Sequence, residues 1–250
     1  MLSLAFYART PDFDKILHAP LQLCKKGLSM IYIAPSLLAA DFANLQSEVK
    51  QMADAGANYL HLDVMDGAFV PNISFGAPVI AALRPCSNLI FDVHLMINEP
   101  IRYIKDFVKA GADIITVHLE ACQDLDATLA EIKRREMRCG VAISPATPVE
   151  KLLPYLAKID MALIMTVVPG FGGQALIPET LEKVRTVRRY AENMGLKLDI
   201  QVDGGIKTEN VHLVTEAGAN IIVAGSSIFG AKKPREVITN MRKIAAEFPW

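Results

Sequence analysis

The sequence predicts a single (β/α)8 TIM barrel, an α/β fold in which eight parallel strands alternate with helices around a closed ring. Three observations lead to this class: a tripeptide that recurs at a regular spacing, strand-like runs that alternate with helical runs, and polar residues that gather at strand ends. The chain has 250 residues, of which 52% are apolar, enough for one large core. We expect residues 30–250 to form one barrel domain and residues 1–29 to be an extension.

The tripeptide Ala-Gly-Ala predicts the number of units. It occurs at residues 55–57, 110–112 and 217–219, each time between a helix-like run and an apolar run. Gly56 and Gly111 are 55 residues apart, and Gly111 and Gly218 are 107 apart, which corresponds to two units of 27.5 residues and four of 26.8. Residues 30–250 therefore hold close to eight units. Glycine directly after a helix allows the left-handed backbone that ends it.

The elements within these units follow the same order along the chain. Strand-like runs end near Ser36, Asp63, His94, His118, Ile143, Thr166, Asp203 and Gly225. Helical spacing of apolar residues covers 45–56, 101–111, 181–195 and 237–248. Alternating strands and helices imply parallel βαβ units, and eight of them favour a closed barrel over an open doubly wound sheet. The active site of such a barrel lies at the C-terminal ends of its strands.

Composition excludes several classes of function. The 26 Lys and Arg residues nearly balance the 27 Asp and Glu residues, which argues against nucleic acid and anionic membranes as partners. The longest apolar stretches are the size of strands, too short to span a bilayer. Cys24, Cys86, Cys122 and Cys139 are far apart and include no C-x-x-C pair. They are therefore predicted to be reduced thiols in a cytoplasmic protein.

Residues 1–29 differ from the rest of the chain. Asp12, Lys15 and His18 interrupt the apolar run that a secretory signal needs, and the acidic residues are atypical of a transit peptide. Three interpretations stay open: ordered packing against the barrel, a disordered tail, or translation from upstream of a natural start at Met30. We favour the last two.

Two histidines and two aspartates at predicted strand ends form a candidate metal site. His61 and Asp63 lie two residues apart on one strand and so share a face, while His94 and Asp203 lie near the ends of two other strands. Imidazole and carboxylate ligands suit Zn²⁺, Fe²⁺, Mn²⁺ or Co²⁺, and a mixed set does not select among them. The alternative is that one or two of these residues are buried polar groups bonded to backbone.

Other polar residues receive a structural interpretation. Asp92 shares the face of His94, and His118 and Glu120 close the fourth predicted strand. We interpret His118 and Glu120 as structural, and His18 and His212 as surface residues.

Three glycine-bearing stretches, at 168–174, 203–206 and 224–227, follow the last three predicted strands. Glycine lets backbone N–H groups approach an anion closely, and barrels often bind phosphate after strands seven and eight. Tight-turn geometry would explain any one stretch, whereas three on adjacent strands favour a phosphate site.

Three methionines also fall at strand ends, namely Met65, Met96 and Met165. They are either ordinary core residues or an apolar wall that keeps water from a proton-transfer site.

Seven segments together resemble the ribulose-phosphate 3-epimerase family. They are IAPSLLAADF (33–42), HLDVMDGAFVPN (61–72), DVHLM (92–96), PATP (145–148), PGFGGQ (169–174), VDGGI (202–206) and VAGSSIF (223–229). The resemblance covers residues 30–250. It implies a barrel of the ribulose-phosphate-binding type that inverts carbon 3 of D-ribulose 5-phosphate to give D-xylulose 5-phosphate in the pentose phosphate pathway.

The resemblance also implies roles for individual residues. The metal ligands would be His61, Asp63, His94 and Asp203, holding one divalent ion per subunit, with Zn²⁺ or Fe²⁺ favoured over Mn²⁺ or Co²⁺. Asp63 would be the base and Asp203 the acid on opposite faces of a metal-stabilised enediolate. Substrate contacts would come from Ser36, His94, Gly172, Gly173, Gly204, Gly205, Gly225 and Ser226, under a cap of Met65, Met96 and Met165. Relatives of this kind associate as dimers or hexamers, so a homo-oligomer is expected.

Two positions depart from the family pattern, and three alternative functions stay open. Val168 stands where the family often has a polar residue, and Ser144 stands where the family commonly has Asn. These two differences put details of substrate binding in doubt. The first alternative is D-allulose-6-phosphate 3-epimerase, which uses the same chemistry. The second is an orotidine-phosphate decarboxylase-like barrel, which needs a Lys where this chain has Met65. The third is a non-catalytic scaffold.

Overall fold

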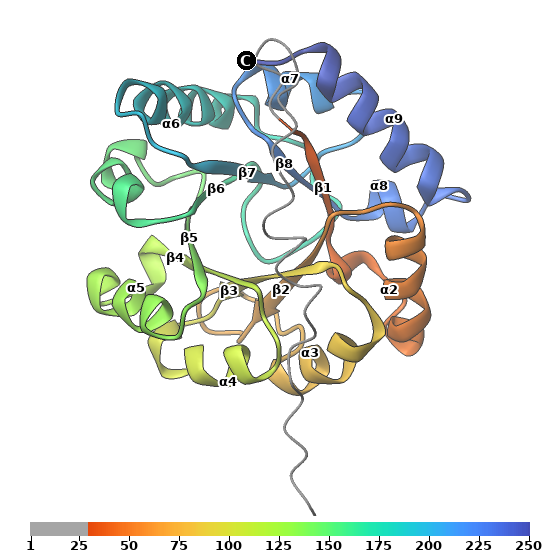
Figure 1. The fold of residues 1–250 in the computed structure, drawn as a ribbon, viewed down its shortest axis with the longest axis horizontal. Helices are drawn as coiled ribbons and strands as arrows, with labels where there is room; N and C mark the ends of the chain where they lie inside the picture. The colour runs from red at the N-terminus through yellow and green to blue at the C-terminus, as the bar shows by residue number, and fades with distance from the viewer. Residues whose placement is uncertain (1–29) are drawn as a thin grey trace, which may run out of the picture.

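A ring of eight parallel strands with helices on its outside makes up the computed structural model, which describes residues 30–250 (Figure 1). The strands are β1 (Tyr32–Pro35), β2 (Tyr59–Met65), β3 (Ile90–Met96), β4 (Ile114–His118), β5 (Arg138–Ile143), β6 (Met161–Met165), β7 (Asp199–Asp203) and β8 (Ile221–Ala224). Their order in the sheet is β1-β8-β7-β6-β5-β4-β3-β2. A bridge between Ser36 and His61 joins the remaining two edges. The predicted barrel is confirmed, and each predicted strand end lies within two residues of the observed one.

Helices connect successive strands on the outside of the ring. The α-helices are α2 (Leu45–Asp54), α3 (Ala77–Leu83), α4 (Ile104–Lys109), α5 (Leu125–Arg134), α6 (Leu181–Asn193), α7 (Val211–Glu216), α8 (Ser226–Phe229) and α9 (Pro234–Glu247). Short 3-10 helices cover Leu37–Ala39, Phe42–Asn44, Arg84–Cys86, Pro100–Arg102, Leu119–Ala121, Val149–Lys151, Leu153–Lys158 and Pro178–Thr180. The connection from β5 to β6 contains only 3-10 helices, because Pro154, in the middle of residues 149–158, lacks the N–H that the interior of an α-helix requires.

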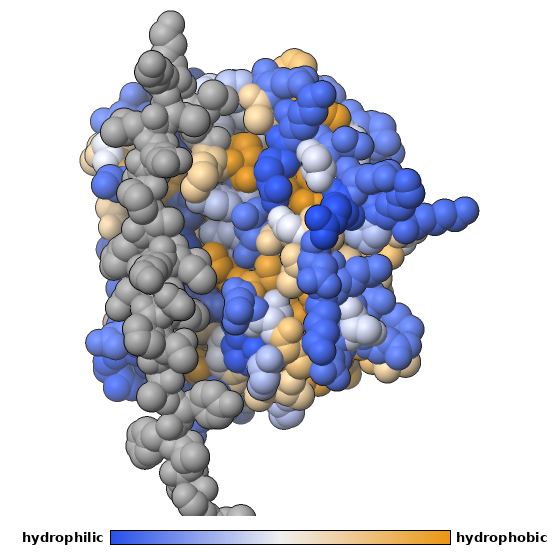
Figure 2. All heavy atoms as spheres, turned by 45° about the vertical axis from the view of Figure 1, so that its right-hand side comes forward, coloured by the Kyte–Doolittle hydropathy of each residue, from blue (hydrophilic) through white to orange (hydrophobic). Residues whose placement is uncertain are grey.

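The helices are amphipathic and bury one face against the strands. In α5, Asp124 caps the first turn by accepting a hydrogen bond from the Ala127 N–H at 2.9 Å. In α9, Ile238 and Met241 are buried against the barrel. Figure 2 shows the outside on the α2 and α9 side, where hydrophilic side chains dominate and hydrophobic ones lie between them. The apolar stripe of each helix therefore supplies the contact with the sheet.

The recurring glycines have the backbone that their position predicts. The φ angles of Gly56, Gly111 and Gly218 are +89°, +93° and +112°, each directly after a helix. A residue with a Cβ atom is strained at such angles, so glycine is required for these turns into β2, β4 and β8.

Apolar and polar layers divide the barrel interior. An apolar cluster of Ala34, Tyr59, Ile114, Met161, Ile221 and Val223 includes the first residues of β2, β4, β6 and β8, toward the strand N-termini. The layer toward the C-terminal ends holds buried polar side chains, among them Asp63, His94 and His118. Because burying an unpaired charge is costly, these groups must form hydrogen bonds or ion pairs with one another or bind a ligand. This end of the barrel is therefore where a functional site is expected.

Two further sequence-based expectations concern the described part of the chain. Within residues 30–250, no helix is both long and apolar enough to cross a membrane. Cys86, Cys122 and Cys139 are free thiols. Expectations for residues 1–29, including those for Cys24 and His18, concern residues outside the described part.

Candidate active site

The pairing of β2 with β3 builds one side of the site. In this register Asp63 lies beside His94, and His61 beside Asp92. Asp203 comes from the end of β7, and Ser36 follows β1. Side chains two residues apart point to the same face of a strand, so the four residues of β2 and β3 enter the barrel interior together. Asp203 and Ser36 line the cavity at the same end of the barrel.

Four side chains predicted from the sequence meet there. Ligand atoms of His61, Asp63, His94 and Asp203 all lie within 4.8 Å of one another. His94 Nδ1 is 3.0 Å from Asp63 Oδ1, and His61 Nε2 is 3.2 Å from the same oxygen. Asp203 Oδ2 is 3.8 Å from His61 Nε2 and 4.0 Å from His94 Nδ1.

This arrangement fits a divalent cation. Bonds of about 2.1 Å in a tetrahedral site place neighbouring ligand atoms roughly 3.4 Å apart. The four histidine–aspartate distances, from 3.0 to 4.0 Å, span this value. Two imidazoles and two carboxylates form a donor set suited to Zn²⁺ or Fe²⁺.

The carboxyl groups of Asp63 and Asp203 differ in their affinity for a proton. Burial opposes ionisation of Asp63, but the charge of His61 and hydrogen bonds from both histidines hold its pKa below the ordinary range. Burial and repulsion from Asp63 raise the pKa of Asp203 to about 7. Ser36 Oγ also donates to Asp63 Oδ2 at 2.6 Å, which favours the ionised carboxylate. Asp63 is thus the stronger acid of the pair.

His61 is oriented by a carboxylate that lies behind it. Asp92 Oδ2 is 2.8 Å from His61 Nδ1 and accepts a second hydrogen bond from Gln201 Nε2 at 2.6 Å. Burial lowers the pKa of His61, but the charges of Asp63 and Asp92 outweigh it and raise this pKa well above its usual value. A carboxylate behind a histidine is typical of metal sites.

His94 is held from behind by a second histidine. His94 Nε2 is 2.9 Å from His118 Nε2, and His118 Nδ1 is 3.1 Å from Glu120 Oε2. Burial lowers the pKa of His118 to about 4. The pKa of Glu120 is lowered to about 2, because hydrogen bonds from His118, Thr147 and Ser144 outweigh its burial. His118, interpreted as structural from the sequence, therefore adjoins the candidate metal ligand His94, and Glu120, interpreted in the same way, adjoins His118.

A cavity of about 630 Å³ opens above the cluster. Its lining includes Ser36, Asp63, Asp203, Met65, Met96, Met165, Gly172, Gly173, Gly204, Gly205, Gly225 and Ser226. Such a volume suits a small phosphorylated ligand. His61 and His94 are fully buried and are not among the residues that line the cavity.

The turn after β7 requires glycine at two positions. Gly204 and Gly205 have φ angles of +122° and +71°. A Cβ atom on Gly204 would lie 2.3 Å from the Val167 side chain, and one on Gly205 would lie 2.2 Å from the backbone nitrogen of Leu176. Gly225 precedes α8, whose first N–H groups have no acceptor within the helix. These turns bring backbone close to one end of the cavity, as the sequence predicts.

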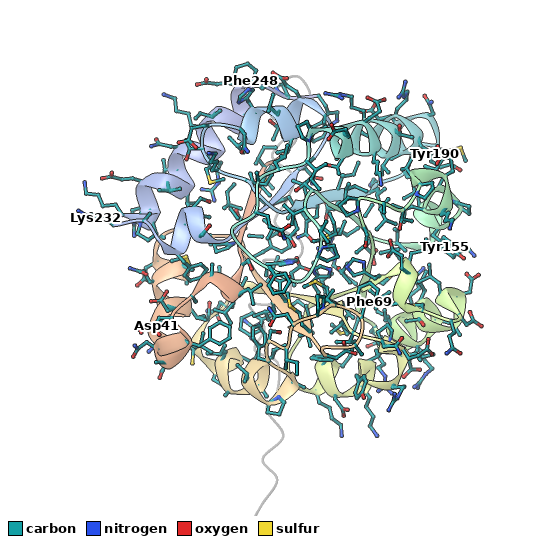
Figure 3. All side chains as sticks on the ribbon, turned by 180° about the vertical axis from the view of Figure 1, so that it is seen from behind. Asp41, Phe69, Tyr155, Tyr190, Lys232 and Phe248 are labelled. Carbon is teal, nitrogen blue, oxygen red and sulfur yellow. The ribbon has the colours of Figure 1, made fainter. Side chains whose placement is uncertain are left out.

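The three methionines lie on two walls of the cavity. Met65 and Met96 pack with Val70, and Met165 belongs to a separate apolar cluster. Phe69 packs beside Met65 and Met96, and its ring centroid is 4.8 Å from that of His118. Figure 3 places Phe69 near the centre of the barrel end, whereas the other labelled residues lie toward its rim. Phe69 could not be predicted from the sequence, because one aromatic residue in a loop carries no distinguishing pattern.

The two positions that depart from the family pattern lie in different surroundings. Val168 is 60% exposed and does not line the cavity. Ser144 is part of the loop after β5, where its N–H donates to Glu120 Oε1 at 2.8 Å. Lys183 on α6 donates to the carbonyls of Ser144, Pro145 and Thr147 at 3.2, 2.6 and 2.6 Å. Ser144 therefore acts through its backbone. Outside this end of the barrel, the half-buried ring of His212 packs on Phe248.

Comparison with known proteins connects this site to one family. The model of the ribulose-phosphate 3 epimerase family matches residues 32–229. A ribulose-phosphate 3-epimerase from Bacillus subtilis is 49% identical over 214 residues, covering 85% of this chain and 99% of that protein. A protein of the same name from Synechocystis is also 49% identical over 214 residues, covering 85% of this chain and 93% of that protein.

A solved structure also shares the fold. The 3-keto-L-gulonate-6-phosphate decarboxylase from Vibrio cholerae superposes with a TM-score of 0.64. It is 17% identical in sequence, and the match covers 89% of this chain and 99% of that one. At this identity the likeness concerns the barrel alone.

Proposed function

The chain belongs to the ribulose-phosphate 3 epimerase family of isomerases, and we propose that it interconverts D-ribulose 5-phosphate and D-xylulose 5-phosphate by moving a proton at carbon 3. One observation carries the mechanism: Asp63 and Asp203 come from strands separated by β1 and β8, yet both reach the same cluster below the cavity. Inversion needs one acid–base group on each face of the reacting carbon. Two carboxyl groups from different sides of the ring can supply them.

The two aspartates take different roles at the start of the reaction. Asp63 is ionised and receives a hydrogen bond from Ser36, so it acts as the base toward D-ribulose 5-phosphate. Asp203, whose pKa is raised to about 7, carries a proton near neutral pH and acts as the acid on the other face. Paired carboxyl groups whose surroundings separate their pKa values are typical of such catalysis. The roles exchange in the reverse direction.

His61, Asp63, His94 and Asp203 would hold one divalent cation per subunit, Zn²⁺ or Fe²⁺ in preference to Mn²⁺ or Co²⁺. When bound, the cation supplies Lewis-acid stabilisation of the negative charge that deprotonation creates on the substrate.

The rest of the cavity would position the sugar phosphate. We assign contacts with it to Ser36, His94, Gly172, Gly173, Gly204, Gly205, Gly225 and Ser226. Backbone N–H groups at the glycine turns and at the start of α8 support a phosphate at that end. Met65, Met96 and Met165 would exclude water above the reacting carbon.

The proposal extends to the organisation of the protein. Residues 30–250 form the catalytic domain, because every residue assigned above lies there, and residues 1–29 form an extension to it. We also propose a cytoplasmic homo-oligomer, dimer or hexamer. The three free thiols of the barrel suit a reducing compartment.

Exchange of the carbon-3 proton with deuterium oxide tests this function. Asp63→Asn and Asp203→Asn should each lower epimerisation by about 10²- to 10⁴-fold or more, the usual contribution of a general acid or base. Asp126→Asn is the matched control, since Asp126 is 61% exposed and pairs with Lys158 on the surface. It should keep the rate of the unchanged protein.

The same assay separates the two aspartates. In a metal-loaded Asp203→Asn protein, Asp63 should still exchange the proton of D-ribulose 5-phosphate without inversion. Near-normal epimerisation in either variant would remove that residue from its role. A higher rate on D-allulose 6-phosphate than on D-ribulose 5-phosphate would identify the hexose phosphate as the substrate.

A further inference from the structure

We propose that Glu120, acting through His118, fixes the proton of His94 on Nε2 and so leaves the lone pair of Nδ1 free for the candidate metal site. Glu120, His118 and His94 are called the histidine relay below. The inference rests on the proposed metal-binding function, but it concerns two residues outside the four-residue cluster. Both are positioning residues, because His118 contacts a candidate ligand and Glu120 contacts His118, and neither is a ligand itself.

The relay is a continuous row of close contacts within the upper barrel. Glu120 Oε2 lies 3.1 Å from His118 Nδ1, and His118 Nε2 lies 2.9 Å from His94 Nε2. His94 Nδ1, on the far side of its ring, lies 3.0 Å from Asp63 Oδ1 and 3.3 Å from His61 Nε2. Both relay rings are fully buried, so water does not compete for these nitrogens.

The outer end of the relay is anchored by the backbone. Glu120 Oε1 accepts hydrogen bonds from the Ser144 N–H at 2.8 Å and from the Thr147 hydroxyl. Lys183 holds the same loop through three carbonyl groups. The carboxylate is therefore fixed with Oε2 directed at His118.

Chemistry then places one proton at each contact. A carboxylate only accepts, so His118 Nδ1 must carry the proton that faces Glu120. A neutral imidazole has a single N–H, so His118 Nε2 is left with a lone pair. At 2.9 Å from it, His94 Nε2 must be the donor. In the metal-loaded protein, His94 Nδ1 would then present its lone pair to the cation, as metal binding requires.

His61 provides a comparison within the same site. Asp92 faces its Nδ1 at 2.8 Å, which leaves Nε2 directed at the cluster. The two histidines thus present different nitrogens, each selected by a carboxylate behind the ring. For His94 the carboxylate is on the next strand's loop, and His118 spans the intervening distance.

Glu120→Gln reverses the order of protons with little change in shape. The Ser144 N–H is part of the backbone and cannot become an acceptor, so the amide oxygen of the new side chain must occupy the position of Oε1. Its NH₂ group then faces His118 Nδ1 and favours the opposite tautomer. His94 is left with its proton on Nδ1, where it opposes a cation.

Zn²⁺ affinity, measured by competition with a chelator, tests this reversal. The expected loss in Glu120→Gln is about 10- to 100-fold, as for other groups that orient metal ligands. Glu99→Gln is the matched control, because Glu99 Oε1 also accepts a backbone N–H from a neighbouring loop, that of Gln123 at 2.8 Å, and lies outside the relay. It should keep the affinity of the unchanged protein. Affinity in Glu120→Gln within about twofold of the control would overturn the proposal.

A nitrogen-15 spectrum of the Zn²⁺-loaded, unchanged protein gives a readout that a purely structural role would not produce. His118 should show a protonated Nδ1 and an unprotonated Nε2 that accepts from His94 Nε2, and the opposite pattern on His118 would overturn the proposal. This measurement stands even if Glu120→Gln does not fold. Failure of the unchanged protein to bind Zn²⁺ would refute the proposed metal site together with the relay. Normal binding with an unaffected Glu120→Gln would refute the relay alone.

Discussion

Gly205 and Gly172 allow a direct test of the glycine-lined end of the cavity. Both are predicted from the sequence to hold phosphate, yet their surroundings differ. Gly205 has a φ angle of +71°, and a Cβ atom there would lie 2.2 Å from the backbone nitrogen of Leu176. A Cβ atom on Gly172 would meet nothing within 4 Å, and its backbone is not left-handed. We therefore expect Gly205→Ala to destabilise the protein and Gly172→Ala to leave it nearly unchanged.

The magnitude follows from two costs. A left-handed backbone costs an L-residue about 1–2 kcal/mol. The contact with Leu176 adds to this, because a backbone atom cannot rotate away as a side chain can. The reduced entropy of the unfolded chain, worth about 0.4–1 kcal/mol, is common to both variants and cancels in their difference. Gly205→Ala should thus be less stable than Gly172→Ala by at least about 2 kcal/mol.

Thermal and urea unfolding measure this difference. For a chain of this size, about 2 kcal/mol corresponds to a Tm lower by roughly 4–8 °C. Substrate KM should also rise in Gly205→Ala, because the turn after β7 and the segment at Leu176 must move apart. Equal Tm values for the two variants would refute the reasoning, since they would mean that the turn relaxes without cost.

Two further predictions concern metal and pH. Zn²⁺ at about 100 times its Kd should stabilise the folded protein by about 2.7 kcal/mol, which raises Tm by roughly 5–10 °C. A chelator should reverse this increase. An equal increase in Tm for Asp203→Asn would contradict the assignment of Asp203 as a metal ligand. Glu120 has a folded-state pKa of about 2, below its ordinary value, so its stabilisation is present above about pH 4.5 and is lost as pH falls through about 2. Its side chain is 24% exposed, so solvent screening reduces the full value of about 3 kcal/mol to about 1–2 kcal/mol. Urea unfolding of the metal-free protein and of metal-free Glu120→Gln measures this effect. The difference between their free energies of unfolding should decrease by about 1–2 kcal/mol from pH 6 to pH 2. A difference that does not change with pH would contradict the prediction.

Much of the fold was predictable because local rules determine it. The recurring Ala-Gly-Ala turns require positive φ angles that only glycine adopts without strain, so their spacing reports the length of the repeating unit. Strand ends were predictable because the change from β-rich runs to glycine and polar residues is visible in the sequence. The connection from β5 to β6 differs from its neighbours, and Pro154 in its middle explains why no α-helix forms there.

The candidate site was predictable only in part. His61 and Asp63 could be placed on one face of a strand, because side chains alternate with a period of two. The role of His118 could not, because a lone histidine at a strand end has the same pattern whether it bonds to backbone or to another ring. Its contact at 2.9 Å with His94 depends on the register between strands, which the sequence does not encode locally.

By itself, the sequence of this protein determined which groups reach the C-terminal end of the barrel: two histidines, two aspartates and three glycine turns. Periodicity and turn chemistry are properties of neighbouring residues, and they need no knowledge of distant ones. Only the tertiary structure decided which atoms face each other. It directs His61 Nε2 and His94 Nδ1 at one point, places Asp92 and His118 behind them, and separates the proton affinities of Asp63 and Asp203. These features depend on burial and on distances between strands that are joined only when the ring closes.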